Sequence, residues 1–354
     1  MTRKNVDPAD RGPAAGTEVS WAPLAEQAAA EVNARYGHRL LGLPGTWIGS
    51  LTQGPHPLRL PRRPWPEWHY WWQAHYLDAV VDSGFAHLRS GSRLAARAEL
   101  QRGHALLRGI LLRNAGRFPN YFFDDMAWLA LAAGRLNQLS LRTVAKPARL
   151  AGRANTTLTG QLHSAYDDVL GGGIYWSRKR DFKNTPANGP AALHLARIGE
   201  TDHARALMDW LRAELFDPAT GLYLDGVHPT PAGRSVETTI YSYNQGTVLG
   251  VLLELGSPED LRQAAALVDA VARNLGDPAG GTRLQPGGGD GSLFTGILCR
   301  YLALAARDTR LPAHTRRTAS GLVTGTAQQV KGLPPRQLSD AVQRWTILSA
   351  AASL

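Results

Sequence analysis

The sequence is poor in cysteine and contains no long hydrophobic run. Its single cysteine, Cys299, lies within the apolar segment GILCRYLALAA, and we interpret it as a buried, reduced residue because it has no partner for an internal disulfide. No apolar stretch approaches the roughly 20 residues that a membrane-spanning helix requires. The first residues also contain no apolar core of the kind found in secretory signals. We therefore expect no integral membrane segment and a cytoplasmic location.

Motifs for metals and phosphates are also missing. The 11 histidines show neither an HExxH motif nor the paired spacing that is typical of a zinc site. The glycine-rich segment 287–291 follows no predicted strand and has no Walker lysine. We therefore predict no catalytic metal and no cofactor.

Positive charge is abundant, but it is scattered. The chain of 354 residues has 39 lysines and arginines against 29 aspartates and glutamates, which gives a formal net charge of +10. Such a balance raises the question of an anionic partner. The arginines are spread through the predicted helices and form no stripe or basic tail. We therefore interpret them as residues on solvent-exposed helix faces, and we expect no nucleic-acid partner.

Helix signals dominate the chain. Ser257 is a candidate N-cap that is followed by Pro258 in the first turn, and Gly276 marks the end of the same periodic segment. Asn244 and Thr201 are further candidate caps. Short β or turn pieces are expected in GGGIYWSR and GLYLDG. Periodicity and capping together predict about twelve helices, over 21–36, 68–82, 93–114, 123–139, 144–170, 188–198, 203–216, 243–255, 258–275, 292–307, 312–330 and 337–352.

The connections between these helices alternate between short turns and longer loops rich in Gly and Pro. This alternation suggests an all-α toroid of six helical hairpins, with the longer loops forming a cleft at one end. Length alone allows one large domain or two small ones. No sharp linker divides the chain, so we predict a single domain over residues 17–354 after a flexible N-terminal segment, residues 1–16.

Four of the longer loops are rich in aromatic residues, amides and glycine. Flat rings stack on the C–H faces of sugars, and amides bond paired hydroxyls, so these loops favour a sugar site. Trp71 and Trp72 follow a helical period instead, and we interpret both as core residues. The four loops are HYWWQAHYLD (69–78), GGGIYWSRKRDFKNTPAN (171–188), IYSYNQG (240–246) and PGGGDGSLFTG (286–296).

Two consecutive carboxylates, Asp124 and Asp125, stand at the start of a predicted buried helix in the segment FDDMAWLALA. Acids in a first helical turn can simply stabilise the helix through its dipole and free N–H groups. They can also act as the paired carboxyl groups of a glycoside hydrolase. A second pair, Asp167 and Asp168, is interpreted as a helix-ending surface pair or a loop brace.

The paired aspartates are accompanied by three further blocks: GGGIYW followed by KNTPAN, YNQG at the start of a helix, and GGGDGSLFTGILCRYL. With these blocks in this order, from about Trp68 to Leu304, the chain resembles glycoside hydrolase family 76, the α-1,6-mannanases with an (α/α)6 barrel. Thr295 stands where this family often has lysine, and KNTPAN replaces the more usual KNAIAN.

The resemblance implies a retaining hydrolase that cleaves α-1,6-mannosidic linkages within a mannan backbone. Asp124 would be the nucleophile and Asp125 the general acid/base. Retention needs two carboxyl groups about 5 to 5.5 Å apart, a spacing that diverging side chains of neighbouring residues can reach. The expected partner is an α-mannan or mannooligosaccharide, free or lipid-linked. Candidate substrate-binding residues are Trp128, Tyr175, Trp176, Asn184, Asn188, Tyr243, Asn244, Gln245 and Asp290.

Three other functions remain open at this level. A transglycosylase would share the fold and the aspartates but pass the mannosyl group to another sugar. A glycan-binding protein without turnover would not need the intact aspartate pair. An isoprenoid cyclase would need a further acid three residues after Asp125, where this chain has Trp128.

Overall fold

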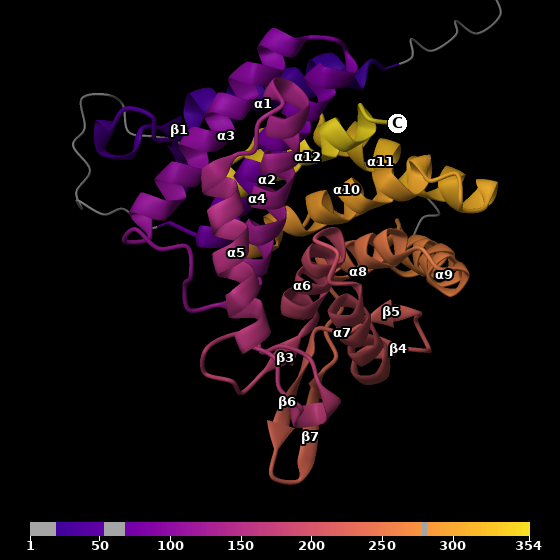
Figure 1. The fold of residues 1–354 in the computed structure, drawn as a ribbon. Helices are drawn as coiled ribbons and strands as arrows, with labels where there is room; N and C mark the ends of the chain where they lie inside the picture. The colour runs from indigo at the N-terminus through magenta and orange to yellow at the C-terminus, as the bar shows by residue number, and fades with distance from the viewer. Residues whose placement is uncertain (1–18, 53–67, 278–281) are drawn as a thin grey trace, which may run out of the picture.

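The computed structural model describes residues 19–52, 68–277 and 282–354 and consists mainly of helices (Figure 1). The segment 1–16, predicted to be flexible, lies outside these residues. All twelve expected helices are present among the described residues. They are α1 (Trp21–Arg35), α2 (Tyr70–Arg89), α3 (Arg93–Arg113), α4 (Phe123–Val144), α5 (Arg149–Ser164), α6 (Thr185–Arg197), α7 (Thr201–Glu214), α8 (Ser242–Leu255), α9 (Pro258–Leu275), α10 (Phe294–Arg307), α11 (Ala313–Val330) and α12 (Leu338–Ala351).

The even-numbered helices form a closed inner ring. Each of α2, α4, α6, α8, α10 and α12 packs on the next, and α12 packs on α2. The odd-numbered helices lie outside this ring: α3 packs on α2 and α4, α5 on α4, α7 on α6, α9 on α8, α11 on α10 and α12, and α1 on α12. This alternation of inner and outer helices is the (α/α)6 barrel that the sequence predicted.

The inner and outer helices differ in how they are buried. An inner helix has neighbours on both sides and outside, so α8 is buried around almost its whole circumference from Asn244 to Leu253. An outer helix buries only one stripe, as α9 does with Ala264, Leu267, Val268 and Val271. A helix that is apolar all round belongs in the interior, whereas a striped helix belongs on the surface.

Local capping explains several of the helix ends. The Ser257 hydroxyl accepts a hydrogen bond from the Asp260 N–H, and the Asp260 carboxylate accepts one from the Ser257 N–H, which forms a capping box before Pro258. The prediction for Ser257 is therefore confirmed. The predicted caps Asn244 and Thr201 are wrong, because Tyr241 and Glu200 occupy the N-cap positions of α8 and α7.

The boundary between α4 and α5 also differs from the prediction. A single helix was expected over 144–170, but α4 runs on to Val144 and α5 covers only Arg149–Ser164. Ala145 has a positive φ of 54°, which ends α4. Pro147 then disfavours helical backbone at the preceding residue.

The strands are short and lie in the loops. β1 (Gly37–His38) pairs with β2 (Ile48–Gly49), and β4 (Phe216–Asp217) pairs with β5 (Leu222–Tyr223). β3 (Lys183–Asn184) and β7 (Gly233–Glu237) flank β6 (Gly226–Thr230) in an antiparallel sheet, and the β6–β7 hairpin projects from the helices at the bottom of Figure 1. The segment GLYLDG contains the expected strand, whereas GGGIYWSR contributes only isolated bridges.

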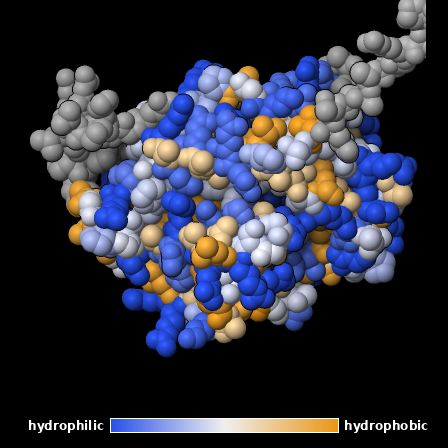
Figure 2. All heavy atoms as spheres, turned by 90° about the horizontal axis from the view of Figure 1, so that it is seen from above, coloured by the Kyte–Doolittle hydropathy of each residue, from blue (hydrophilic) through white to orange (hydrophobic). Residues whose placement is uncertain are grey.

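The surface is mixed in polarity. Figure 2 shows the face seen from above, where hydrophilic residues cover much of the surface and hydrophobic ones lie in scattered groups. Among the described residues, no helix combines the length and the apolar character needed to cross a bilayer.

Candidate active site

A cavity of about 480 Å³ lies where α2 and α4 begin. Asp124, Asp125 and Trp176 all line it, so the structure brings together three of the predicted site residues. Trp71 lines it too, so its interpretation as a core residue is wrong, whereas Trp72 is buried as expected. The remaining lining residues are Trp68, His69, Tyr70, Asn114, Asn120, Tyr121 and Phe122.

Asp124 is a partly buried carboxylate that accepts two hydrogen bonds. The backbone N–H of Asp125 donates to Oδ1 at 2.8 Å, and the indole N–H of Trp176 donates to Oδ2 at 3.0 Å. Burial raises the pKa of Asp124 to about 7, and the negative charge of Asp225 adds to this rise. The two donors act in the opposite direction because they stabilise the ionised form.

Asp125 has a different environment. It is only 8% exposed, and the amide of Asn120 donates to its Oδ2 at 2.6 Å. Burial, and then the charge of Asp124, raise the pKa of Asp125 well above its usual value. With one side-chain donor and a like charge beside it, Asp125 favours the protonated form, whereas the two donors to Asp124 favour its ionised form.

Asn120 was not among the predicted site residues. Besides its bond to Asp125, its Oδ1 accepts a hydrogen bond from the N–H of Phe122 at 3.1 Å, and its backbone carbonyl accepts one from Arg178 at 2.9 Å. Asn120 therefore ties the start of α4 to the loop that contains Trp176. In the sequence, the feature that could have pointed to Asn120 as a site residue is its position five residues before Asp125.

Asp225 is a third carboxylate that the sequence did not indicate. It follows β5, and the Asn244 amide lies 3.4 Å from its Oδ1. Burial raises the pKa of Asp225 to about 6. Its charge acts on both Asp124 and Tyr243, so it lies within electrostatic range of the pair. A lone aspartate in a turn gives no sequence pattern that would single it out.

Aromatic rings connect the starts of α2, α8 and α10. Tyr243 stacks on Phe294 with ring centroids 3.9 Å apart and an angle of 14° between the planes. Phe294 also lies 6.1 Å from Trp71. Trp128, a predicted substrate contact, is only 5% exposed and packs on His75 and Tyr243. It is therefore part of the core and does not line the cavity.

Several predicted substrate contacts hold loops in place and do not line the cavity. Asn188 is fully buried and bonds both backbone groups of Ile174, at 2.7 and 2.9 Å. Asn184 caps α6 by accepting a hydrogen bond from the Ala187 N–H at 3.2 Å. Tyr175 is 3% exposed and packs under the ammonium group of Lys183. The Asn188 amide is thus bonded to the loop that contains Trp176, and the Asn184 side chain to the start of α6.

The amides of α8 behave in the same way. Gln245 is fully buried, accepts a hydrogen bond from the Tyr223 N–H at 2.9 Å and donates to the Tyr223 carbonyl at 2.8 Å. Asn244 is also fully buried and reaches the site only through Asp225. Asp290 lies in the 3-10 helix η3 (Gly289–Leu293), and its side chain is outside what the structure describes.

Residues 46–332 match the family model described as glycosyl hydrolase family 76. The chain belongs to this family. Its resemblance to family 76, based on the four sequence blocks, is thereby confirmed, and membership of this family supports a glycosidase. The comparison with curated proteins gave no match.

Solved structures with the same fold include members of this family. The GH76A α-1,6-mannanase from Salegentibacter sp. HEL1_6 is 26% identical, with a TM-score of 0.78 over 94% of this chain and 99% of that chain. An inactive variant of that enzyme, in which two consecutive aspartates are replaced by asparagine, was solved with α-1,6-mannotriose at the same identity and TM-score. The Lin0763 protein from Listeria innocua, 23% identical, has a TM-score of 0.76 over 94% of this chain and 97% of its own.

Proposed function

We propose that the protein hydrolyses α-1,6-mannosidic linkages within an α-mannan backbone and retains the anomeric configuration. The observation that carries this proposal is that Asp124 and Asp125 line one cavity in different environments. The similar Salegentibacter enzyme is an α-1,6-mannanase, and replacing two consecutive aspartates accompanies its inactive state. These likenesses support a mannan or a mannooligosaccharide as the substrate.

The chemistry gives each carboxyl group a different role. Asp124, charged and held by the N–H groups of Asp125 and Trp176, attacks the anomeric carbon and forms a mannosyl-enzyme. Asp125 gives its proton to the leaving oxygen as the glycosidic bond breaks. It then removes a proton from the water that cleaves the mannosyl-enzyme, so both groups return to their starting states.

The test is to incubate the purified protein with linear α-1,6-mannan and to follow the products by NMR. Shortened chains that first appear with the α configuration support retaining, endo-acting hydrolysis. Products that first appear with the β configuration would show inversion, and release of mannose alone would show exo action. Longer products in the presence of an added acceptor sugar would show that the protein is a transglycosylase.

Two variants separate the roles of the aspartates. Asp124→Asn should abolish turnover of every mannoside, because no covalent intermediate can form. Asp125→Asn should abolish turnover of mannan but keep bond cleavage in an aryl mannoside whose leaving group needs no proton. Near-normal mannan hydrolysis by either variant would remove the assignment, and glycan binding without turnover by the wild type would leave only a binding protein.

A further inference from the structure

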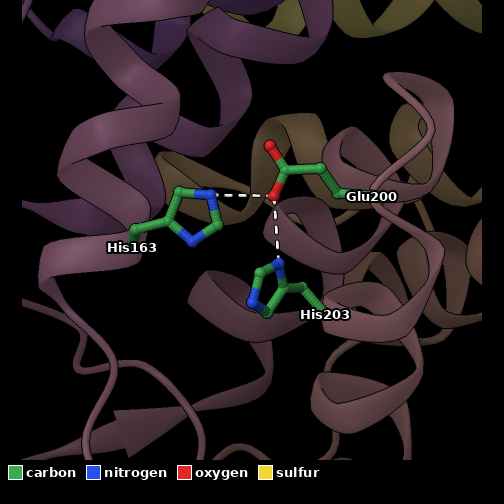
Figure 3. A group of neighbouring side chains, drawn as sticks. All are labelled: His163, Glu200 and His203. Atoms are coloured by element: carbon green, nitrogen blue, oxygen red, sulfur yellow. Dashed lines mark hydrogen bonds and ion pairs between the residues drawn. The ribbon is translucent and has the colours of Figure 1, made fainter.

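Three side chains able to ligate a metal meet on the surface, away from the aspartate cavity (Figure 3). His163 lies in the last turn of α5, Glu200 immediately precedes α7, and His203 lies in the first turn of α7. Glu200 Oε2 is 2.8 Å from Nε2 of His163 and 3.1 Å from Nδ1 of His203. One ligand atom from each residue lies within 4.8 Å of the other two.

The geometry of this cluster suits a metal better than a helix cap. Glu200 occupies the N-cap position of α7, but its side chain makes no capping hydrogen bond. It points instead toward the two imidazole rings, as Figure 3 shows. In a tetrahedral zinc site with bonds of about 2.0–2.1 Å, ligand atoms stand roughly 3.3 Å apart, so the two distances from the Glu200 oxygen need little adjustment.

The donor atoms also select the class of metal. Two imidazole nitrogens and one carboxylate oxygen suit Zn²⁺ and its first-row neighbours, whereas Mg²⁺ and Ca²⁺ prefer oxygen ligands alone. All three side chains retain access to solvent, with exposed fractions of 39% for His163, 34% for Glu200 and 66% for His203. Water can therefore complete the coordination.

We propose that His163, Glu200 and His203 form a zinc site that clamps the end of α5 to the start of α7. The end of α5 is the base of the loop that contains Trp176. There the Tyr175 N–H donates to the carbonyl of Ala165 at 3.2 Å, and Tyr166 pairs with Ile174. The bound metal stabilises this base and takes no part in sugar chemistry.

The sequence predicts no catalytic metal, because neither an HExxH motif nor a paired spacing of histidines is present. Here His163 is contributed by a helix far along the chain from the other two ligands, and only folding brings it near them. The local signal was the spacing of Glu200 and His203, three residues apart at a helix start, which places both side chains on one face. The proposed site is a structural one on the surface, which that prediction did not consider. We propose no metal for the aspartate cavity.

The test uses full-length protein without a polyhistidine tag, treated with EDTA and dialysed. Calorimetric titration with Zn²⁺ should show one site in the wild type, and excess Zn²⁺ should raise Tm by a few degrees because the metal binds the folded state. His163→Ala, His203→Ala and Glu200→Gln should each weaken this binding at least about tenfold, since even the loss of an outer-shell partner commonly costs that much.

His314→Ala is the matched control, since His314 is an exposed histidine on α11 and has no place in the cluster. It should bind Zn²⁺ as the wild type does. Hydrogen exchange gives a second measurement, in which Zn²⁺ should slow exchange of the Tyr175 N–H in the wild type but not in Glu200→Gln. No binding by the wild type at micromolar Zn²⁺, or equal affinity in Glu200→Gln and His314→Ala, would overturn the site and leave an adventitious ion only.

Discussion

Asp124 and Asp125 are chemically identical, and only their neighbours give them different properties. Asp124 accepts hydrogen bonds from a backbone amide and an indole, while Asp125 has the Asn120 amide and a charged neighbour. The resulting difference in pKa is what an acid and a nucleophile need in one site. The indole of Trp176 is the donor that substitution can remove most cleanly.

Trp176→Phe should shift the pH profile of hydrolysis. The indole N–H lowers the pKa of Asp124 from what burial alone would give, so its loss should raise that pKa above about 7. A hydrogen bond to a charged group contributes about 1.5–3 kcal/mol, and the acid limb of kcat/KM should move to higher pH by about one unit. If the acid limb stayed at the same pH in Trp176→Phe and kcat/KM fell equally at every pH, Trp176 would act only by stacking on the substrate.

Asp225→Asn should shift the same limb in the opposite direction. The charge of Asp225 raises the pKa of Asp124, so its removal should lower that pKa and extend activity toward acid. The Asn244 amide can still donate to the new side chain. The measurement is again kcat/KM against pH, and a shift toward higher pH would contradict the electrostatic role.

The burial of Asp124 also lowers the stability of the folded protein at neutral pH. The pKa of Asp124 rises from 3.8 to about 7 on folding, so the folded state holds this proton more tightly than the unfolded state does. The stabilisation of the folded state by the proton on Asp124 is fully present below pH 3.8. It is lost as the pH rises through about 7.

Asp124→Asn should therefore stabilise the protein, and the gain should depend on pH. Each pH unit between the unfolded and folded pKa values costs the native wild type about 1.4 kcal/mol, and the uncharged amide avoids this cost. The rise in Tm over the wild type should be largest near pH 8 and should shrink toward zero near pH 4. A gain that is equal at both pH values would show that charge is not its cause.

The residues that could and could not be predicted differ in how local their signals are. Asp124 and Asp125 form a local pattern that the sequence shows directly. The amides Asn188 and Gln245 lie in the right segments, but which way a buried amide points depends on distant backbone groups, here those of Ile174 and Tyr223. Asp225 is brought near the pair by the arrangement of helices alone.

At the scale of elements, the loop between α5 and α6 determines where Trp176 lies. Gly173 has a positive φ of 79° and packs against the ring of Trp210, whose indole N–H donates to the carbonyl of Leu170 at 2.9 Å. A Cβ atom at Gly173 would lie 2.6 Å from that ring. The glycine is required here both for its backbone conformation and for the close approach.

Gly173→Ala should lower both Tm and kcat, because the loop must shift away from Trp210 and move Trp176 from Asp124. Gly171→Ala is the matched control: Gly171 also has a positive φ, of 74°, but a Cβ there would meet nothing within 4 Å. The control variant should be destabilised only by the strained backbone at residue 171, which costs about 1–2 kcal/mol. Equal losses in the two variants would mean that the contact with Trp210 is unimportant.

Most elements could be predicted because helix periodicity and capping are local. The capping box at Ser257 was predicted correctly, whereas the α4–α5 boundary was missed although Pro147 marks it, because the positive φ at Ala145 that ends α4 has no sequence signal of its own. The closure of the ring, where α12 packs on α2, joins segments more than 200 residues apart. The alternation of short turns and longer loops suggests a toroid, and the resemblance to a known family implies the barrel, but neither shows which residues join α12 to α2.

At the scale of the whole molecule, the two ends of the inner ring have different charges. The aspartate pair lies where inner helices start, and a cavity of about 520 Å³ lies where α2, α4, α6, α10 and α12 end. Helix C-termini carry partial negative charge, so cationic side chains stabilise them. Arginines that looked scattered in the sequence gather around this second cavity: Arg89, Arg135, Arg142, Arg197, Arg300 and Arg307.

Two of these arginines bind a pair of buried acids and connect three inner helices. Arg300 on α10 contacts Asp78 at 3.1 Å and Asp82 at 2.8 Å, both on α2, and Arg135 on α4 pairs with the same two carboxylates. The side chain of Arg300 is only 10% exposed. Removing Arg300 leaves two carboxylates with a single arginine, Arg135, and an uncompensated charge in a buried network typically costs about 3–5 kcal/mol.

Arg300→Met should therefore lower the free energy of unfolding by several kcal/mol, measured by chemical denaturation at neutral pH. Arg307→Met provides the comparison on the same helix, because Arg307 is exposed and, among the described residues, donates a hydrogen bond only to the carbonyl of Ala303. A substitution at such a site usually changes stability by no more than about 0.5 kcal/mol. If both variants lost the same small amount, the buried network would not hold α2, α4 and α10 together, and apolar packing alone would account for the closed ring.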